Sequence, residues 1–193
     1  GKFTDRRAAA LKAWHEWLPV RTSDLSDLRK IYRSFDFGGL AALHMLETRL
    51  IGRDKPVEFA DLLNPATASS AMATLASPTR SLMGAAQLGW LQGQLAASKA
   101  TWQVLGQQVL MARMSFPVSV LTALNPSNTS ADALTAGQKA ITDYLTAKGT
   151  AAQAPTLLTD TQKALLNTSL NPLLGYNLDA WDGYPVEREV LLS

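Results

Sequence analysis

The sequence predicts an α/β fold with about three or more strands, several covering helices and a helical insertion. Residues 31–37 alternate apolar and polar side chains with the period of a strand, and a second strand-like run at 40–48 follows a Gly-Gly pair. An amphipathic pattern at 84–98 separates these runs from a third strand candidate at 102–111. A strand, a helix and a strand in this order predict a crossover connection and parallel pairing.

The second strand is predicted to be buried on both faces because its apolar residues are nearly continuous, although its composition also allows a helix. The helix at 84–98 has its leucines on one stripe, and the glutamines, Gln87 among them, lie off that stripe. Residues 50–80 are predicted to be irregular, with a short helix left open at 57–63.

The first and last elements are predicted to be helices. Residues 3–18 carry apolar side chains at spacings near three and four, and Pro19 ends the pattern because proline disfavours helical geometry in the residue before it. Pro185 opens a last helix to Ser193, at a position where its missing N–H costs nothing.

Residues 114–176 have a different character and predict a peripheral helical insertion or lid. Helices are expected near 131–148, capped by Gly149, and near 159–168, where Thr159 and Gln162 have the spacing of a capping box. Loops are expected at Pro117, Asn125-Pro126, Pro155 and Asn171-Pro172. The resulting division is an α/β core over 1–113, the insertion over 114–176, and a return to the core over 177–193.

Composition excludes several classes of function. The 193 residues form about one domain with a net charge of +2, which is too small to predict a nucleic-acid partner. Absence of cysteine excludes disulfides, thiolate metal ligands and thiol nucleophiles. No run of 18 apolar residues exists, so no membrane-spanning helix is expected.

The residues that could carry chemistry are sparse. His15 has no second histidine at the spacing of a helical zinc motif, and His44, on a buried strand, is expected to be a hydrogen-bonded core residue. Arg49 follows that strand, where α/β proteins bind ligands, and its guanidinium suits a phosphate. A structural ion pair for Arg49 is the competing interpretation. Gln107 and Gln108, inside the third strand, are expected to serve packing.

The turn at 181–185 is the other candidate. Asp182 suits a tight turn and a helix cap, and Tyr184 leads the chain into a helix whose N-terminal amides favour an anion. We therefore predict Arg49, Asp182 and Tyr184 as substrate-binding residues. A cap turn anchored by Trp181, with no functional role, is the alternative for this segment.

Six segments, in order, resemble the alkaline phosphatase D family of bacterial metallophosphatases. They are RRAAALKAWHEWLPVR at 6–21, YRSFDFGGLA at 32–41, LHMLETR at 43–49, LMGAAQ at 82–87 with WL at 90–91, WQVLGQQV at 102–109, and WDGYPVER at 181–188. Glu47 departs from the family, which usually has Asp there, and residues 114–176 match none of its motifs.

The resemblance implies a partial metallophosphatase-type sandwich. It implies iron and calcium in the parent enzyme, hydrolysis of phosphate mono- or diesters, and a periplasmic or secreted location. The family's metal ligands belong to an upstream set and to a downstream Asp-Val-His segment. We expect this chain to lie between them, so no metal ligand is assigned within it.

Two hypotheses about function follow. The first is that the chain is an interior fragment of a phosphatase or phosphodiesterase, inactive in isolation, whose sheet edges are open to self-association. The alternative is a complete, non-catalytic interaction module of helical or α/β type.

Overall fold

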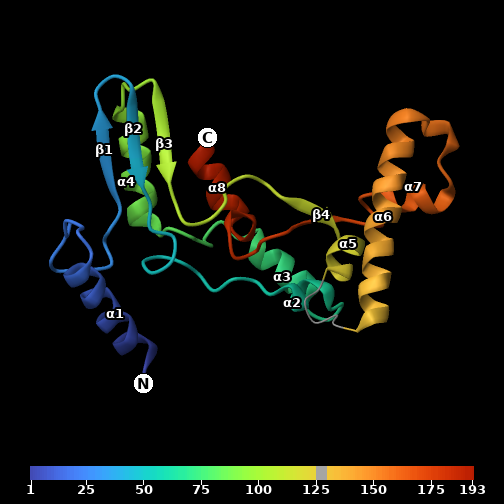
Figure 1. The fold of residues 1–193 in the computed structure, drawn as a ribbon, viewed down its shortest axis with the longest axis horizontal. Helices are drawn as coiled ribbons and strands as arrows, with labels where there is room; N and C mark the ends of the chain where they lie inside the picture. The colour runs from blue at the N-terminus through green and yellow to red at the C-terminus, as the bar shows by residue number, and fades with distance from the viewer. Residues whose placement is uncertain (125–129) are drawn as a thin grey trace. The chain divides into compact units, whose positions relative to one another are not determined.

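The computed structural model describes residues 1–124 and 130–193, so the loop expected at Asn125-Pro126 lies outside the described residues. The fold is α/β, as the sequence predicts (Figure 1). The chain forms two compact units, which we describe separately. Unit 1 comprises residues 1–55, 76–110 and 184–193, and unit 2 comprises residues 56–75 and 111–183.

Unit 1 contains a mixed three-stranded sheet. Strands β1 (Arg33–Phe37) and β2 (Ala41–Met45) form an antiparallel hairpin, and β3 (Trp102–Gly106) pairs with β2 in parallel. The hairpin turn places Gly38 at φ 61°, a backbone conformation that glycine adopts without a steric penalty. Helix α4 (Ala85–Ala97) makes the crossover between β2 and β3. The predicted hairpin, crossover and parallel pairing are confirmed.

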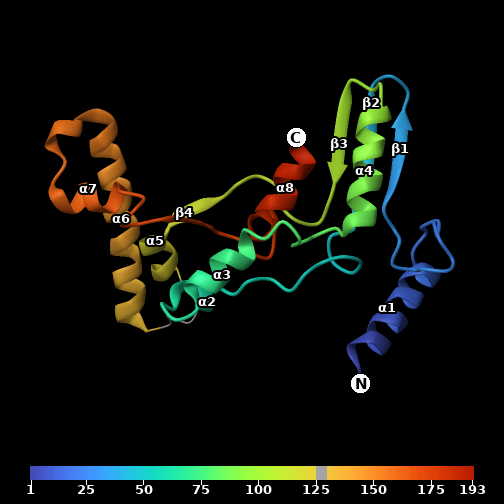
Figure 2. The same ribbon diagram turned by 180° about the vertical axis from the view of Figure 1, so that it is seen from behind.

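Helix α4 covers one face of this sheet (Figure 2). The ring of Trp90 lies 4.8 Å from that of Tyr32 and 6.4 Å from that of His44. Gln87, expected off the buried stripe, is completely buried. That expectation was wrong because the Gln87 amide satisfies backbone groups beyond β2, and a satisfied amide can be buried.

The opposite face of the sheet exposes large apolar side chains. Burial on β2 alternates, so the prediction that both faces are buried was wrong. On β1, Ser34 lies on the covered face beside His44, and the aromatic side chains lie on the uncovered one. The exposed side chains are Phe35, Phe37, Met45, Trp102 and Val104.

Two helices complete unit 1. Helix α1 (Phe3–Trp17) ends just before Pro19, as predicted, and Leu18 has extended geometry. Helix α8 (Pro185–Leu192) begins at the predicted proline. The third strand candidate is shorter than predicted, because β3 ends at Gly106, the register partner of the last residue of β2. Beyond that point β2 offers no strand to pair with, so Gln107 and Gln108 lie outside β3.

Unit 2 is mostly helical. Helices α2 (Phe59–Leu63) and α3 (Ala68–Leu75) precede β4 (Ser115–Pro117) and α5 (Val118–Ala123). The long helix α6 (Ala131–Gln153) leads through η1 (Pro155–Leu157) to α7 (Asp160–Leu166). Strand β5 (Leu173–Gly175) pairs antiparallel with β4, and η2 (Trp181–Gly183) ends the unit. Its core includes Val57, Leu62, Ala71 and Leu178.

Three expectations for unit 2 are corrected. Helix α3 lies in the stretch expected to be irregular, because its alanines favour helix and Ala71 packs into the core. Helix α6 continues past Gly149, which does not cap it, since the alanines that follow sustain the helix. The β4–β5 pair adds strands to a stretch expected to be helical.

The structure confirms the helices near 131–148 and 159–168, the capping box, and the short helix at 57–63. The division into 1–113, 114–176 and 177–193 stays a prediction. Within the described ranges, no helix has both the length and the apolar character that crossing a bilayer requires.

Candidate functional site

The carboxyl ends of β2 and β3 lie at the same edge of the sheet, because the two strands run in parallel. Glu47, Thr48 and Arg49 follow β2, and Gln107 and Gln108 follow β3. The Thr48 hydroxyl donates to the Gln108 Oε1 at 2.7 Å, and the Thr48 N–H donates to the same oxygen at 3.3 Å. This edge therefore gathers the polar residues of both strands.

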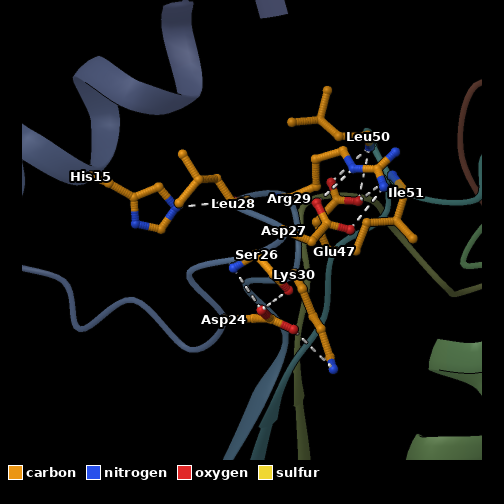
Figure 3. Close-up of polar contacts among 10 residues, drawn as sticks. All are labelled: His15, Asp24, Ser26, Asp27, Leu28, Arg29, Lys30, Glu47, Leu50 and Ile51. Atoms are coloured by element: carbon orange, nitrogen blue, oxygen red, sulfur yellow. Dashed lines mark hydrogen bonds and ion pairs between the residues drawn. The ribbon is translucent and has the colours of Figure 1, made fainter. Parts of the chain in front are cut away.

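Glu47 organises the turn that follows β2. Glu47 is 1% exposed, and its carboxylate accepts hydrogen bonds from three successive backbone N–H groups, of which Figure 3 shows those of Leu50 and Ile51. Oε1 accepts from Arg49 at 2.7 Å and from Leu50 at 2.9 Å, and Oε2 accepts from Leu50 and Ile51 at 2.9 Å. Such a run of amides forms a concave nest that favours an anion.

The main chain of Glu47 is held from the other side by α4. Its N–H donates to the Gln87 Oε1, and its carbonyl accepts from the Gln87 Nε2, both at 2.7 Å. The completely buried Gln87 thus fixes the backbone where the turn begins.

Arg49 is exposed, whereas Glu47 and Thr48 before it are buried. Arg53, four residues on, donates from its guanidinium to the Thr48 carbonyl at 3.3 Å. The structure therefore places Arg49 at the carboxyl edge of the sheet, where the sequence predicts it.

Tyr184 lies in unit 1 and is completely buried. Its hydroxyl donates to the Asp54 carbonyl at 2.5 Å. The guanidinium of Arg80 lies 4.5 Å from the centre of its ring and that of Arg53 lies 5.5 Å away, within range of cation–π attraction. Because Arg53 contacts both Tyr184 and the end of β2, it links Tyr184 to the segment that carries Arg49.

Asp182 belongs to unit 2, within η2. Its Oδ1 accepts from the backbone N–H of Met114 at 3.4 Å. Gly175 passes close to Asp182, and a Cβ on that glycine would lie 2.7 Å from the Asp182 Cβ. The structure thus brings two of the three predicted residues, Arg49 and Tyr184, into one unit. The roles of all three stay predictions.

Sequence reasoning missed a second buried carboxylate, Glu187 on α8. It accepts from the Ser81 hydroxyl at 2.8 Å, from the Leu82 N–H, and from the Met83 N–H at 3.4 Å. Glu187 therefore joins the last helix to the segment before α4. A glutamate in the first turn of a helix opened by proline was the available signal, but its partners lie about a hundred residues away in the chain.

Both histidines use both ring nitrogens within the protein. The Nδ1 of His44 contacts the Ser34 hydroxyl at 2.7 Å, and its Nε2 contacts the Gln103 Oε1 at 3.1 Å. His15 contacts the Thr22 hydroxyl at 2.9 Å and the Leu28 carbonyl at 3.0 Å. His44 is thus the hydrogen-bonded core residue that the sequence predicts.

This arrangement does not fit a metal centre. Imidazole binds a metal through an unoccupied nitrogen, and the ring nitrogens of His15 and His44 are in use. Over residues 1–124 and 130–193, no group of three or more His, Asp or Glu side chains could hold a metal ion. No catalytic step through a metal can be built on these residues.

The groups with shifted pKa values belong to the loop after α1 (Figure 3). Hydrogen bonds from the Arg29 guanidinium hold the pKa of Asp27 below its ordinary value, and Asp27 raises the pKa of Arg29. Hydrogen bonds from Ser26 lower the pKa of the half-buried Asp24. These groups stabilise the loop, and Figure 3 shows Asp27 and Arg29 beside Glu47.

The fold and the polar edge define an α/β protein with polar groups at the carboxyl ends of two parallel strands. Comparison with known proteins gives the family, since the PhoD-like phosphatase family matches residues 1–193. The chain belongs to the PhoD-like phosphatase family.

Two relatives agree with this assignment. The chain is 28% identical to alkaline phosphatase D of Bacillus subtilis (strain 168), over 99% of this chain and 23% of that protein. A solved structure of PhoD superposes with a TM-score of 0.54 at 26% identity, covering 97% of this chain and 25% of the other. The chain thus spans about a quarter of the length of these relatives.

Proposed function

We propose that this chain forms part of a metal-dependent phosphatase or phosphodiesterase that hydrolyses phosphate esters. The observation that carries the proposal is the family match over residues 1–193. The polar edge of the sheet supports it, because open α/β sheets bind ligands beyond the carboxyl ends of their strands.

In this proposal, Arg49 binds the phosphate group of the substrate. Arg49 is exposed at the sheet edge, and a guanidinium has paired donors that match phosphate oxygens. Tyr184 is a further substrate-side residue of unit 1, and Asp182 stays a separate prediction within unit 2. Since the ring of Tyr184 is completely buried, it would act by holding Arg53 beside the end of β2. Replacing Arg49 with Ala should raise KM for an aryl phosphate, and an unchanged KM would rule this role out.

Iron and calcium would supply Lewis-acid chemistry and an activated water in the parent enzyme. The described residues do not fit such a centre, so we propose that its ligands come from outside this chain. The isolated 193-residue chain should therefore be inactive. We also propose that the parent works in the periplasm or outside the cell, and cell fractionation followed by immunoblotting tests this location.

The experiment compares the full-length protein with the 193-residue chain on a generic aryl phosphate and on a phosphodiester, each with added iron and calcium. We expect hydrolysis by the full-length protein and none by the chain. Turnover by the chain alone would overturn the assignment of the metal ligands elsewhere. A full-length protein that hydrolyses neither ester would overturn the proposed function.

A second candidate, a non-catalytic interaction module, is favoured by the apolar face of the sheet. Phe37 is 59% exposed and Trp102 is 65% exposed on the face opposite α4. In the phosphatase proposal, this face packs inside a larger sandwich. In the second proposal, the protein uses this face or the sheet edges to bind a partner or another copy of itself. Analytical ultracentrifugation tests the case of another copy: self-association that a Phe37→Ser change weakens would favour the second candidate.

A further inference from the structure

The turn after β2 depends on the reach of one side chain. The backbone of Glu47 is held in place by Gln87, with two hydrogen bonds of 2.7 Å. The Glu47 carboxylate then accepts hydrogen bonds from the backbone N–H groups of residues 49–51. With its backbone fixed, the length of the Glu47 side chain sets how far the turn stands from the strand.

The first group held in this way is the backbone of Arg49. Its N–H makes a 2.7 Å hydrogen bond with Oε1 of Glu47. Glu47 itself is 1% exposed, so it is shielded from a ligand, whereas Arg49 is exposed. Glu47 can therefore affect a ligand by determining where the main chain of Arg49 lies.

We propose that Glu47 is a positioning residue for Arg49, setting where the guanidinium meets the phosphate of the substrate. This inference rests on the proposed function, in which Arg49 binds that phosphate. A shorter carboxylate would draw the turn inward by about 1.5 Å, the length of one carbon–carbon bond. A displaced Arg49 would bind the phosphate less well in the ground state and the transition state alike, and such a loss appears in KM.

The test uses Glu47→Asp, which keeps the charge and shortens the reach to that of the residue usual in the family, whereas the turn of this chain is held by the longer side chain. Glu187→Asp is the matched control. Glu187 is also buried and accepts hydrogen bonds from residues 81–83, but it makes none with Arg49. In the full-length protein we expect Glu47→Asp to raise KM for an aryl phosphate about tenfold with kcat nearly unchanged. Glu187→Asp should leave KM within about twofold, although both changes lower the unfolding temperature.

A double-mutant cycle with Arg49→Ala identifies the route of the effect. If Glu47 acts through Arg49, Glu47→Asp should change KM by less than about twofold once Arg49 is alanine. If the double variant instead raises KM by the product of the two single effects, this inference is overturned, while the substrate role of Arg49 stays intact. An Arg49→Ala variant with unchanged KM would overturn both.

A second readout does not depend on activity. In ¹⁵N NMR spectra of the 193-residue chain, Glu47→Asp should move the backbone signals of residues 49–51 and the Nε–H signal of Arg49. Glu187→Asp should instead move the signals of residues 81–83. Unmoved Arg49 signals would overturn the positioning role. If the full-length protein is inactive, the proposed function fails, and these spectra still decide whether Glu47 positions Arg49.

Discussion

Replacing Gly52 with alanine should destabilise unit 1, because two loops touch there backbone to backbone. A Cβ on Gly52 would lie 2.3 Å from the Cα of Gly84, 2.4 Å from its nitrogen and 2.7 Å from the carbonyl carbon of Met83. All three are backbone atoms, so no side chain can swing away. The new methyl group must push the loops apart.

The loops resist separation because hydrogen bonds join them. The Asp54 N–H donates to the Ser81 carbonyl at 2.9 Å, and the Ser81 N–H donates to the Asp54 carboxylate at 2.8 Å. Overpacking of a close contact costs about 1–3 kcal/mol, and each hydrogen bond contributes about 1 kcal/mol net. We expect Gly52→Ala to lower the free energy of unfolding by about 3 kcal/mol. For a chain of this length, that lowers Tm by about 6–12 °C.

Thermal and urea unfolding followed by circular dichroism measure the effect. The control is Gly89→Ala in α4, where an added Cβ meets no atom within 4 Å. Alanine is the better helix former, so this variant should gain about 0.5–1 kcal/mol. If Gly52→Ala unfolds within about 1 °C of the unmodified chain, the loops are free to move apart and the reasoning is refuted.

Three further changes test other parts of the chain. Thr159→Ala removes the capping box of α7 and should cost about 1 kcal/mol in urea unfolding; Thr159→Ser should restore most of it, and equal stability of all three proteins would contradict the cap. Gly149→Ala, inside α6 with open space around the new methyl group, should gain about 0.5–1 kcal/mol, and a loss would show that the glycine is needed there. Asp27→Asn should destabilise the chain slightly at pH 7, because the Arg29 contact lowers the pKa of Asp27 and so stabilises the fold while Asp27 is ionised. This difference should begin to shrink as the pH falls below about 4, the ordinary range of an aspartate, and should vanish once the pH lies below the lowered pKa of Asp27; a difference that persists at that acidity would exclude the ionic explanation.

Local patterns in the sequence predicted the secondary structure where a helix or strand depends on its own residues. The helix before Pro19, the helix opened by Pro185 and the capping box at Thr159 follow from side chains within a few positions of each other. The Gly-Gly hairpin and the crossover through α4 have the same local origin. Arg49 could be placed at the sheet edge because it directly follows the strand predicted at 40–48, and β2 ends only a few residues before it.

The sequence predicted less about element ends and buried polar groups. The third strand candidate stops at Gly106 because its partner strand stops, and nothing within residues 102–111 indicates where β2 ends. Gln87 was expected on a polar face, yet the structure buries it against backbone groups of Glu47, forty residues away.

The amino-acid sequence by itself determined the α/β class, the order of the main helices and strands and the resemblance to a phosphatase family, because these depend on short-range periodicity and on ordered motifs. Tertiary structure alone decided which polar groups share an environment. The Glu47 turn closed by Gln87, the Glu187 contact with Ser81 and the link from Tyr184 to Asp54 join segments that are distant in the chain. A buried polar group needs a partner, and only folding determines which one comes within hydrogen-bonding distance.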